Sequence, residues 1–347
     1  MNATNLKLTR KTVLLPLLGI VAFFLYILLF NVNIFEIVAT AQTANPVFYS
    51  IAILMGFADV FLQAVSWRVL LSALKVEISV TRSFIYTWYG IFMDIVIPAE
   101  SISGDVCRVY SVNREQNGTS GKTLASVTMQ RILGMTVNVI ILLLGIAFLF
   151  GTPKIDPIIF TLSLFFTATI TLSLCILLAI SWKETWGIKV INGLIRIGEF
   201  ISRGRWKQKF DSLKQETLRA ALIFHESMKE FGRKPQTLIL PTFLIFLHWF
   251  SNLAIPYLVF LSLGYPVSWA VIFVIFSIVV VVQSTPIGMI GAPEITMMTM
   301  FYAMDVPDGI SATAIILTRL ITLWLRVGVG FAAQQWVELK PVSTTPR

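Results

Sequence analysis

The chain has 347 residues, of which 56% are hydrophobic and 13% charged, and its formal net charge is +9. Soluble domains contain roughly 45–50% apolar and about 25% charged residues, so this composition excludes a soluble enzyme, a disordered protein and a disulfide-stapled secreted module. Two cysteines and two histidines, widely separated, predict neither a disulfide framework nor a metal site, and we expect no cofactor. The composition predicts an all-α, multi-pass protein of the cell membrane.

Six apolar stretches are long enough to cross about 30 Å of hydrocarbon as helices. They cover residues 13–31, 47–74, 123–150, 157–181, 237–263 and 310–337. The first follows basic residues, as in a signal peptide, but it is longer than the apolar core of about 7–15 residues in such peptides. We therefore interpret it as a retained membrane span.

Two further apolar stretches, 83–112 and 268–304, are interrupted near the middle by helix-breaking residues. These are Pro98 and Gly104 in the first stretch, and Pro286, Gly288, Gly291 and Pro293 in the second. Broken membrane helices typically line a cavity or a binding site. Each stretch is predicted to be a re-entrant hairpin of two half-helices that enters and leaves on the same side.

The basic residues indicate the orientation of the chain. With the N-terminus in the cytoplasm, the cytoplasmic segments hold 22 of the 27 lysines and arginines, and the external loops hold only Lys154. This asymmetry is the positive-inside signal, and it places both termini in the cytoplasm. The largest cytoplasmic segment, 182–236, has apolar residues at helical intervals, which predicts basic amphipathic helices. We expect these helices to lie on the anionic lipids of the inner leaflet, and we expect no nucleic-acid partner. A solvated helical linker without lipid specificity is the alternative.

Two similar units, about 47–150 and 237–337, lie within a single membrane transporter domain that covers 1–347. Each unit consists of a span, a broken hairpin that carries a carboxylate, and a second span that carries an arginine. Arg131 and Arg319 each lie 33 residues after the first proline of their hairpin. The topology gives the two units opposite orientations, which is typical of alternating-access transporters with a site near the midplane.

Charged side chains inside the spans are the strongest candidates for a site, because such residues are normally paired or functional. The natural partner of Arg131 is Asp105, and that of Arg319 is Glu294. We expect both arginines to bind a phosphate-bearing headgroup, with the carboxylates as their partners when the site is empty. A purely structural ion pair that fixes each hairpin is the alternative.

Several other polar positions near the breaks are weaker candidates. Half-helix N-termini would present free backbone N–H groups to an anion, although glycines there are equally explained as helix breakers. The remaining candidate substrate contacts are Ser101, Ser103, Gly104, Gly288, Gly291 and Arg108, and the candidate pathway residues are Asp94, Glu100, Asp59 and Arg326. Arg108 is also explained by a local pair with Asp105, and the hairpin carboxylates by solvation at the hairpin mouth.

The stretches Asp94–Arg108 (DIVIPAESISGDVCR) and Pro286–Glu294 (PIGMIGAPE) resemble the two motifs of a known family. This is the flippase-like integral membrane family that contains the transmembrane region of lysylphosphatidylglycerol synthase, and the resemblance covers about residues 10–337. It implies movement of lipids between leaflets. The chain departs from the family in having Ser103-Gly104 instead of a glycine pair. Because no aminoacyl-transferase domain follows residue 347, lysyl transfer is not implied.

The favoured interpretation is a flippase-like transporter, not an enzyme, for an anionic phospholipid or a polyprenyl-phosphate-linked lipid. The main alternative is an integral membrane glycosyltransferase that acts on polyprenyl-linked sugars. Such an enzyme would need carboxylates in the external loops, which offer Glu36, Asp156, Asp305 and Asp308. An accessory subunit that recruits a cytosolic protein through 182–236 is a third possibility, and the sequence leaves an oligomer open.

Overall fold

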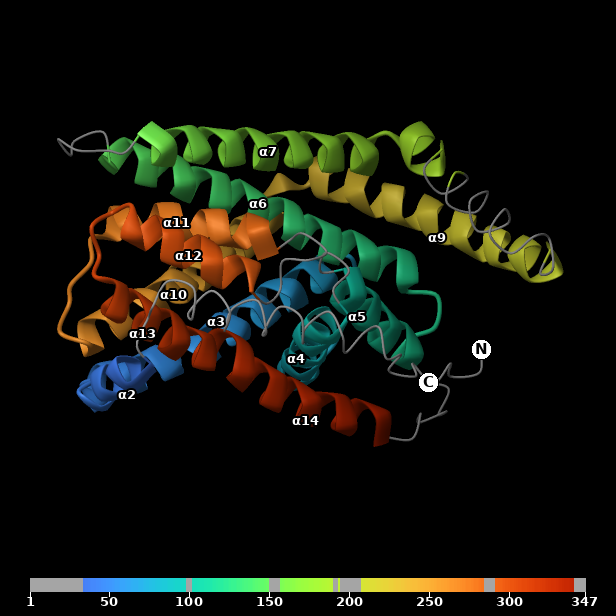
Figure 1. Ribbon diagram of the computed structural model, residues 1–347. Coiled ribbons are helices and arrows are strands. Elements are labelled where there is room, and N and C mark those ends of the chain that lie inside the picture. Colours follow the sequence, from blue (N-terminus) through green and yellow to red (C-terminus); the bar gives the residue numbers. More distant parts are fainter. Residues whose placement is uncertain are drawn as a thin grey trace.

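The computed structural model describes residues 34–97, 102–149, 157–189, 193, 207–283 and 291–339. All regular secondary structure within these ranges is helical, and the helices form an elongated bundle (Figure 1). In chain order they are α2 (Ile34–Gln42), α3 (Pro46–Ala73), α4 (Val80–Val96), α5 (Ile102–Glu115), α6 (Ser120–Leu149), α7 (Pro157–Trp182), α9 (Lys207–Arg233), the 3-10 turn η1 (Pro235–Leu238), α10 (Ile239–Ser262), α11 (Trp269–Gln283), α12 (Ala292–Tyr302), α13 (Asp308–Arg319), the π-helical segment η2 (Leu320–Leu325) and α14 (Arg326–Leu339).

Five helical stretches in the described ranges are long and apolar enough to cross a membrane. They are Pro46–Ala73, Ser120–Phe148, Ser163–Trp182, Pro235–Ser262 and Asp308–Glu338. These correspond to five of the six predicted spans, and the sixth, 13–31, lies outside the described residues. The prediction of an all-α, multi-pass membrane protein is confirmed.

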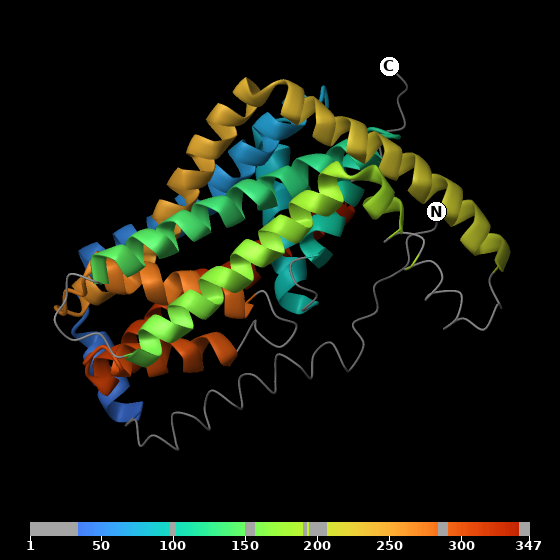
Figure 2. The same ribbon diagram turned by 90° about the horizontal axis from the view of Figure 1, so that it is seen from above.

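Each interrupted apolar stretch forms two separate helices. The helices α4 and α5 replace one helix across 83–112, and α11 and α12 do so across 268–304. In each case the two helices pack against one another. Figures 1 and 2 show the α4–α5 pair and the α11–α12 pair towards opposite ends of the long helices.

The helices α3 and α10 pack against each other along the middle of the bundle. The α3 helix begins at Pro46, directly after Asn45. The side chain of Asn45 caps the helix by accepting a hydrogen bond of 2.9 Å from the Val47 N–H. A capping side chain followed by proline is a strong signal for the start of a helix. The large α3 side chains of Trp67 and Leu70 are completely buried.

The first helix of each hairpin packs against the last span of the other predicted unit. Thus α4 lies on α14, and α11 lies on α6. Glycines allow both close approaches, because a Cβ at Gly330 would lie 2.5 Å from Phe92 Cβ, and one at Gly145 would lie 2.9 Å from Val274 Cγ2. The two hairpins therefore connect the two units reciprocally.

The helix α9 occupies about half of the segment 182–236, which was predicted to be amphipathic and basic. It packs against α6 and α7 through a face that buries Ala221, Met228 and Phe231, and Figure 2 shows it extending beyond the rest of the bundle. Basic side chains such as Arg219 and Arg233 are exposed. Contact of this helix with anionic lipids stays a prediction.

Candidate functional site

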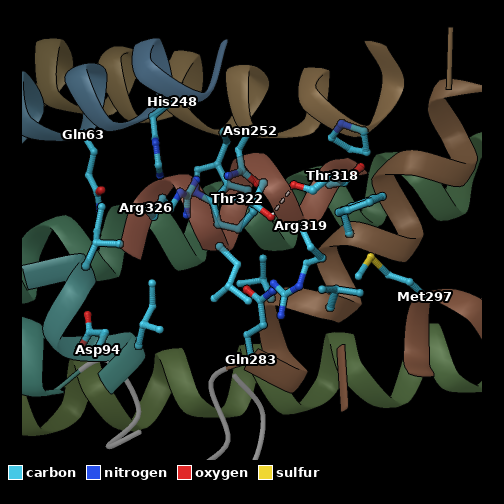
Figure 3. A pocket seen from close by; sticks show the side chains of 18 residues that line it. Gln63, Asp94, His248, Asn252, Gln283, Met297, Thr318, Arg319, Thr322 and Arg326 are labelled. Carbon is cyan, nitrogen blue, oxygen red and sulfur yellow. Dashed lines mark hydrogen bonds between the residues drawn. The ribbon is translucent and has the colours of Figure 1, made fainter. Parts of the chain in front are cut away.

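A cavity of about 280 Å³ lies among the helices of the two predicted units (Figure 3). Its wall combines apolar side chains, such as Phe276, Val279 and Leu323, with many polar ones. The polar lining residues are Gln63, Asp94, His248, Asn252, Gln283, Thr318, Arg319, Thr322 and Arg326. A mostly apolar wall with a few convergent polar groups is the usual form of a site for a small ligand or headgroup.

Polar residues from corresponding helices of the two predicted units line the cavity. Gln63 of α3 and Asn252 of α10 do so, and so do Asp94 of α4 and Gln283 of α11. The cavity therefore draws polar side chains from both units.

Arg319 lines the cavity, and Glu294 pairs with it from behind the lining. Glu294 is 3% exposed and Arg319 is 7% exposed, and the Nε–H of Arg319 donates a hydrogen bond to Glu294 Oε1. The other carboxylate oxygen, Oε2, accepts a hydrogen bond of 2.7 Å from the N–H of Gly291. Gly291 has φ = 91°, a backbone conformation that favours glycine, and it precedes the first residue of α12. Glu294 thus caps its own half-helix while it holds an arginine of the following span.

The Asp105 cluster consists of Asp105, Arg108 and Arg131, and both guanidinium groups donate hydrogen bonds to this one carboxylate. Arg108 also donates to Gln130 Oε1 at 2.8 Å and lies over the ring of Trp67, 5.1 Å from its centroid. The side chain of Arg131 is 32% exposed. With two arginines and one carboxylate, this cluster has a formal excess of positive charge.

Asp94 fixes the start of α5. Its Oδ1 accepts a hydrogen bond of 2.6 Å from the Gly104 N–H, and it lies 2.9 Å from the Ser103 hydroxyl. The prediction that these half-helix N-termini present free N–H groups to an anion is wrong for Gly104 and for Gly291. Helix N-termini need acceptors, and here the carboxylates of Asp94 and Glu294 supply them.

The Asp59 cluster joins three helices that sequence reasoning did not bring together. Asp59 of α3 accepts a hydrogen bond of 2.6 Å from Arg326 Nη2 of α14, and His248 Nδ1 of α10 lies 2.7 Å from its other carboxylate oxygen. Asp59 and Arg326 were predicted only as separate pathway residues, and His248 was not among the predicted site residues. The available signal was that all three are ionisable groups in apolar spans.

The π-helical segment η2 separates the two arginines of the last span. Leu320–Leu325 follow Arg319 directly and end just before Arg326. Short π-helical stretches inside α-helices are frequent at functional sites. In this chain both arginines that flank the segment line the cavity, one paired with Glu294 and the other with Asp59.

The predicted site residues divide into four groups. Ser103, Gly104 and Gly291 lie at the starts of α5 and α12 and donate hydrogen bonds to Asp94 or Glu294. Asp94, Arg319 and Arg326 line the cavity. Five others form ion pairs but are not part of that lining: Asp59, Asp105, Arg108, Arg131 and Glu294. Glu100, Ser101 and Gly288 lie outside the described residues.

These features define a multi-pass membrane protein with ion-paired charges inside its spans and a polar cavity between them. The sequence matches the family model of the lysylphosphatidylglycerol synthase TM region over residues 14–330, and the chain belongs to this family. It is 25% identical to a UPF0104 membrane protein of Pyrococcus horikoshii over 92% of this chain and 95% of that protein. UPF0104 membrane proteins of Methanocaldococcus jannaschii and Methanothermobacter thermautotrophicus are each 22% identical, over 95% and 93% of this chain respectively and 95% of each relative.

Proposed function

We propose that the protein moves an anionic, phosphate-bearing lipid between the leaflets of the membrane. The observation that carries this proposal is the cavity, which is built from both predicted units and has a buried arginine, Arg319, in its wall. An arginine inside a membrane protein is expensive to bury and is normally paired or functional. Arginine also suits phosphate, because its planar guanidinium group donates two parallel hydrogen bonds.

Glu294 provides the competing partner that a carrier needs. In the structure its carboxylate accepts the hydrogen bond from Arg319 Nε, where a headgroup phosphate would otherwise accept one. When a lipid phosphate arrives, it replaces the carboxylate at the guanidinium group, and Glu294 keeps its bond from the Gly291 N–H. When the lipid leaves, the ion pair re-forms, so neither charge is left uncompensated in the empty carrier.

Arg131 occupies the equivalent position in the first unit and does not line the cavity. Its partner Asp105 also forms an ion pair with Arg108. The carboxylate of the first hairpin therefore pairs with two guanidinium groups, whereas Glu294 of the second hairpin pairs with Arg319. In the proposed cycle Arg131 receives the headgroup when the cavity opens on the other side. The order of helices and the reciprocal packing of the hairpins support two units of this kind.

The test is lipid movement by the purified full chain in liposomes that contain a fluorescent phosphatidylglycerol. A membrane-impermeant reductant bleaches the outer-leaflet label, so faster loss of inner-leaflet fluorescence measures transport. We expect Arg319→Lys to slow transport roughly tenfold or more, because lysine keeps the charge but loses the two-pronged hydrogen bonding.

Arg68→Lys is the matched control, since Arg68 is also an arginine within a span but donates to the Ile78 carbonyl oxygen at 2.9 Å and does not line the cavity. It should transport at the normal rate. Transport by the Arg319→Lys protein at the rate of the unaltered chain would refute the headgroup role. Transfer of sugar from a polyprenyl-linked donor in the same preparation would favour the glycosyltransferase instead.

A further inference from the structure

The ring of His248 is oriented by Asp59. Its Nδ1 forms a hydrogen bond of 3.1 Å with the Asp59 backbone carbonyl oxygen and lies 2.7 Å from the carboxylate Oδ1. Both oxygens are acceptors, so Nδ1 carries a hydrogen. The opposite nitrogen, Nε2, has no hydrogen-bond partner among the described residues, and the ring lines the cavity (Figure 3). His248 therefore presents to the cavity the nitrogen that can take up a second proton.

Asp59 has an incompletely satisfied carboxylate beside this ring. It is 1% exposed, and its Oδ1 has no partner in hydrogen-bond geometry within the described part of the chain, although Oδ2 accepts from Arg326 Nη2. A buried charged oxygen without a hydrogen bond is costly. A positive charge on the imidazole 2.7 Å away would compensate this oxygen directly.

We propose that His248 is a proton-binding site, and that a proton at its Nε2 and an anionic headgroup at Arg319 bind to the cavity together. This inference rests on the proposed transport function and adds to it the co-substrate. The proton comes from water on the side where the lipid enters and returns to water on the side where the lipid leaves, so a pH difference across the membrane drives net movement.

The charges around His248 explain the sign of the coupling. The charged groups that contact His248 or line its cavity are Asp59 of α3, Asp94 of α4, Arg319 of α13 and Arg326 of α14, and Glu294 of α12 adds a fifth charge as the partner of Arg319. On the other elements packed against α10, Arg131 of α6 is paired with Asp105, whereas α11 and η1 have no titratable side chain.

With a neutral His248, the five charges that surround the cavity sum to −1, and a bound phosphodiester lowers the sum to −2. Protonation of His248 restores −1, so the proton offsets the charge that the headgroup brings. Because coupling between two ligands is reciprocal, the headgroup strengthens proton binding by the same factor by which the proton strengthens headgroup binding.

The experiment measures binding of a soluble short-chain phosphatidylglycerol to the purified full chain in nanodiscs. Its phosphodiester does not titrate in the range used, about pH 5.5 to about pH 8, which brackets histidine. We expect affinity on the order of tenfold higher at the lower pH. Short-chain phosphatidylcholine is the zwitterionic control and should show no such increase.

His248→Gln tests the residue, because a glutamine amide can still donate to Asp59 but cannot take up a proton. It should bind phosphatidylglycerol at both pH values with the affinity that the unaltered chain has at the higher pH. Asp94→Asn removes the other titratable group of the lining and should keep the pH dependence. The only other histidine, His225, is buried on α9 with Nδ1 2.9 Å from the Ser181 carbonyl oxygen, so His225→Gln is the matched control and should also keep it.

The outcomes separate this inference from the proposed function. Binding that depends on Arg319 but is equal at both pH values would overturn the proton site and leave lipid transport standing. A pH dependence that persists in His248→Gln would overturn it as well. Absence of phosphatidylglycerol binding at either pH, together with Arg319→Lys behaving as the unaltered chain, would overturn both.

Discussion

Asp59, Asp105 and Glu294 each accept hydrogen bonds from at least one arginine of another helix or of the next turn. Burying a charge in the hydrocarbon region is expensive, so each carboxylate and its arginine are tolerated only together. A buried pair contributes little net stability compared with apolar residues of the same size, whereas removing one partner is strongly destabilising. These clusters therefore constrain which helices lie side by side.

The Glu294–Arg319 pair allows a double-mutant cycle. Glu294→Gln takes the carboxylate away from a buried guanidinium group and should lower the free energy of unfolding by about 3–5 kcal/mol. Glu294→Gln combined with Arg319→Gln should be less destabilising than Glu294→Gln alone, because no net charge then stays buried. Unfolding in mixed micelles with increasing denaturing detergent measures both. A double variant that loses the sum of the two single losses would show that the side chains do not interact.

Gly104 lies where α4 and α5 approach most closely. A Cβ at this position would lie 2.4 Å from the Gly90 carbonyl oxygen and 2.4 Å from Asp94 Oδ2. Gly104→Ala should therefore separate the two half-helices and destabilise the fold by about 1–3 kcal/mol, with loss of transport. The matched control is Gly328→Ala in α14, where nothing lies within 4 Å of the added methyl group. It should be neutral or stabilise by up to about 1 kcal/mol, since alanine favours helix over glycine. Equal thermal stability of the two variants would contradict this account.

The sequence predicted the ion pairs within each unit but not the one between units. Asp105 and Arg131 are 26 residues apart, and Glu294 and Arg319 are 25 apart, so a hairpin followed by a span is enough to bring them together. Asp59 and Arg326 are 267 residues apart and meet only because the last span returns to α3. Packing of this kind is decided by the whole bundle, and no local pattern encodes it.

The hairpins are the elements through which the two units are connected. Each places its first helix on the last span of the other unit, α4 on α14 and α11 on α6. The proline and glycine breaks made these hairpins predictable, because clusters of such residues favour helix ends, although a single proline such as Pro256 lies inside α10. The π-helical segment was not predictable, since its sequence, LITLWL, contains no helix breaker and reads as an ordinary apolar helix.

The helix α9 offers a test of the predicted lipid partner. Arg219 and Arg233 are exposed, and a basic residue near an anionic bilayer surface contributes about 1 kcal/mol. Arg219→Gln combined with Arg233→Gln should therefore weaken association with phosphatidylserine-containing vesicles by roughly 30-fold at low salt. Glu226→Gln, which removes an exposed negative charge from the same helix, should strengthen it. If sedimentation with vesicles is the same for all three proteins, α9 is a solvated linker.

At the scale of the whole molecule, hydropathy and the positive charges determined the number and order of the spans. Those signals add up along the chain and need no knowledge of packing. The cavity has no such signal, because its lining combines residues from α3, α4, α10, α11, α12, α13, η2 and α14. Only single polar residues within apolar spans, such as Gln63 and Asn252, are visible in the sequence, and nothing local shows that they share a cavity.

The predicted opposite orientation of the two hairpins is the property of the whole molecule on which the proposed transport depends. Thr81 in the first turn of α4 and Tyr302 at the end of α12 are both exposed. Figure 1 shows the α4–α5 pair and the α11–α12 pair towards opposite ends of the bundle. In a chain whose Cys107 and Cys175 are replaced by serine, Thr81→Cys should react with a membrane-impermeant maleimide only in inside-out vesicles. Tyr302→Cys should react only in right-side-out vesicles. Because the two hairpins of an inverted pair must open on different faces, reaction of both cysteines from the same side would exclude an alternating-access carrier built from these units.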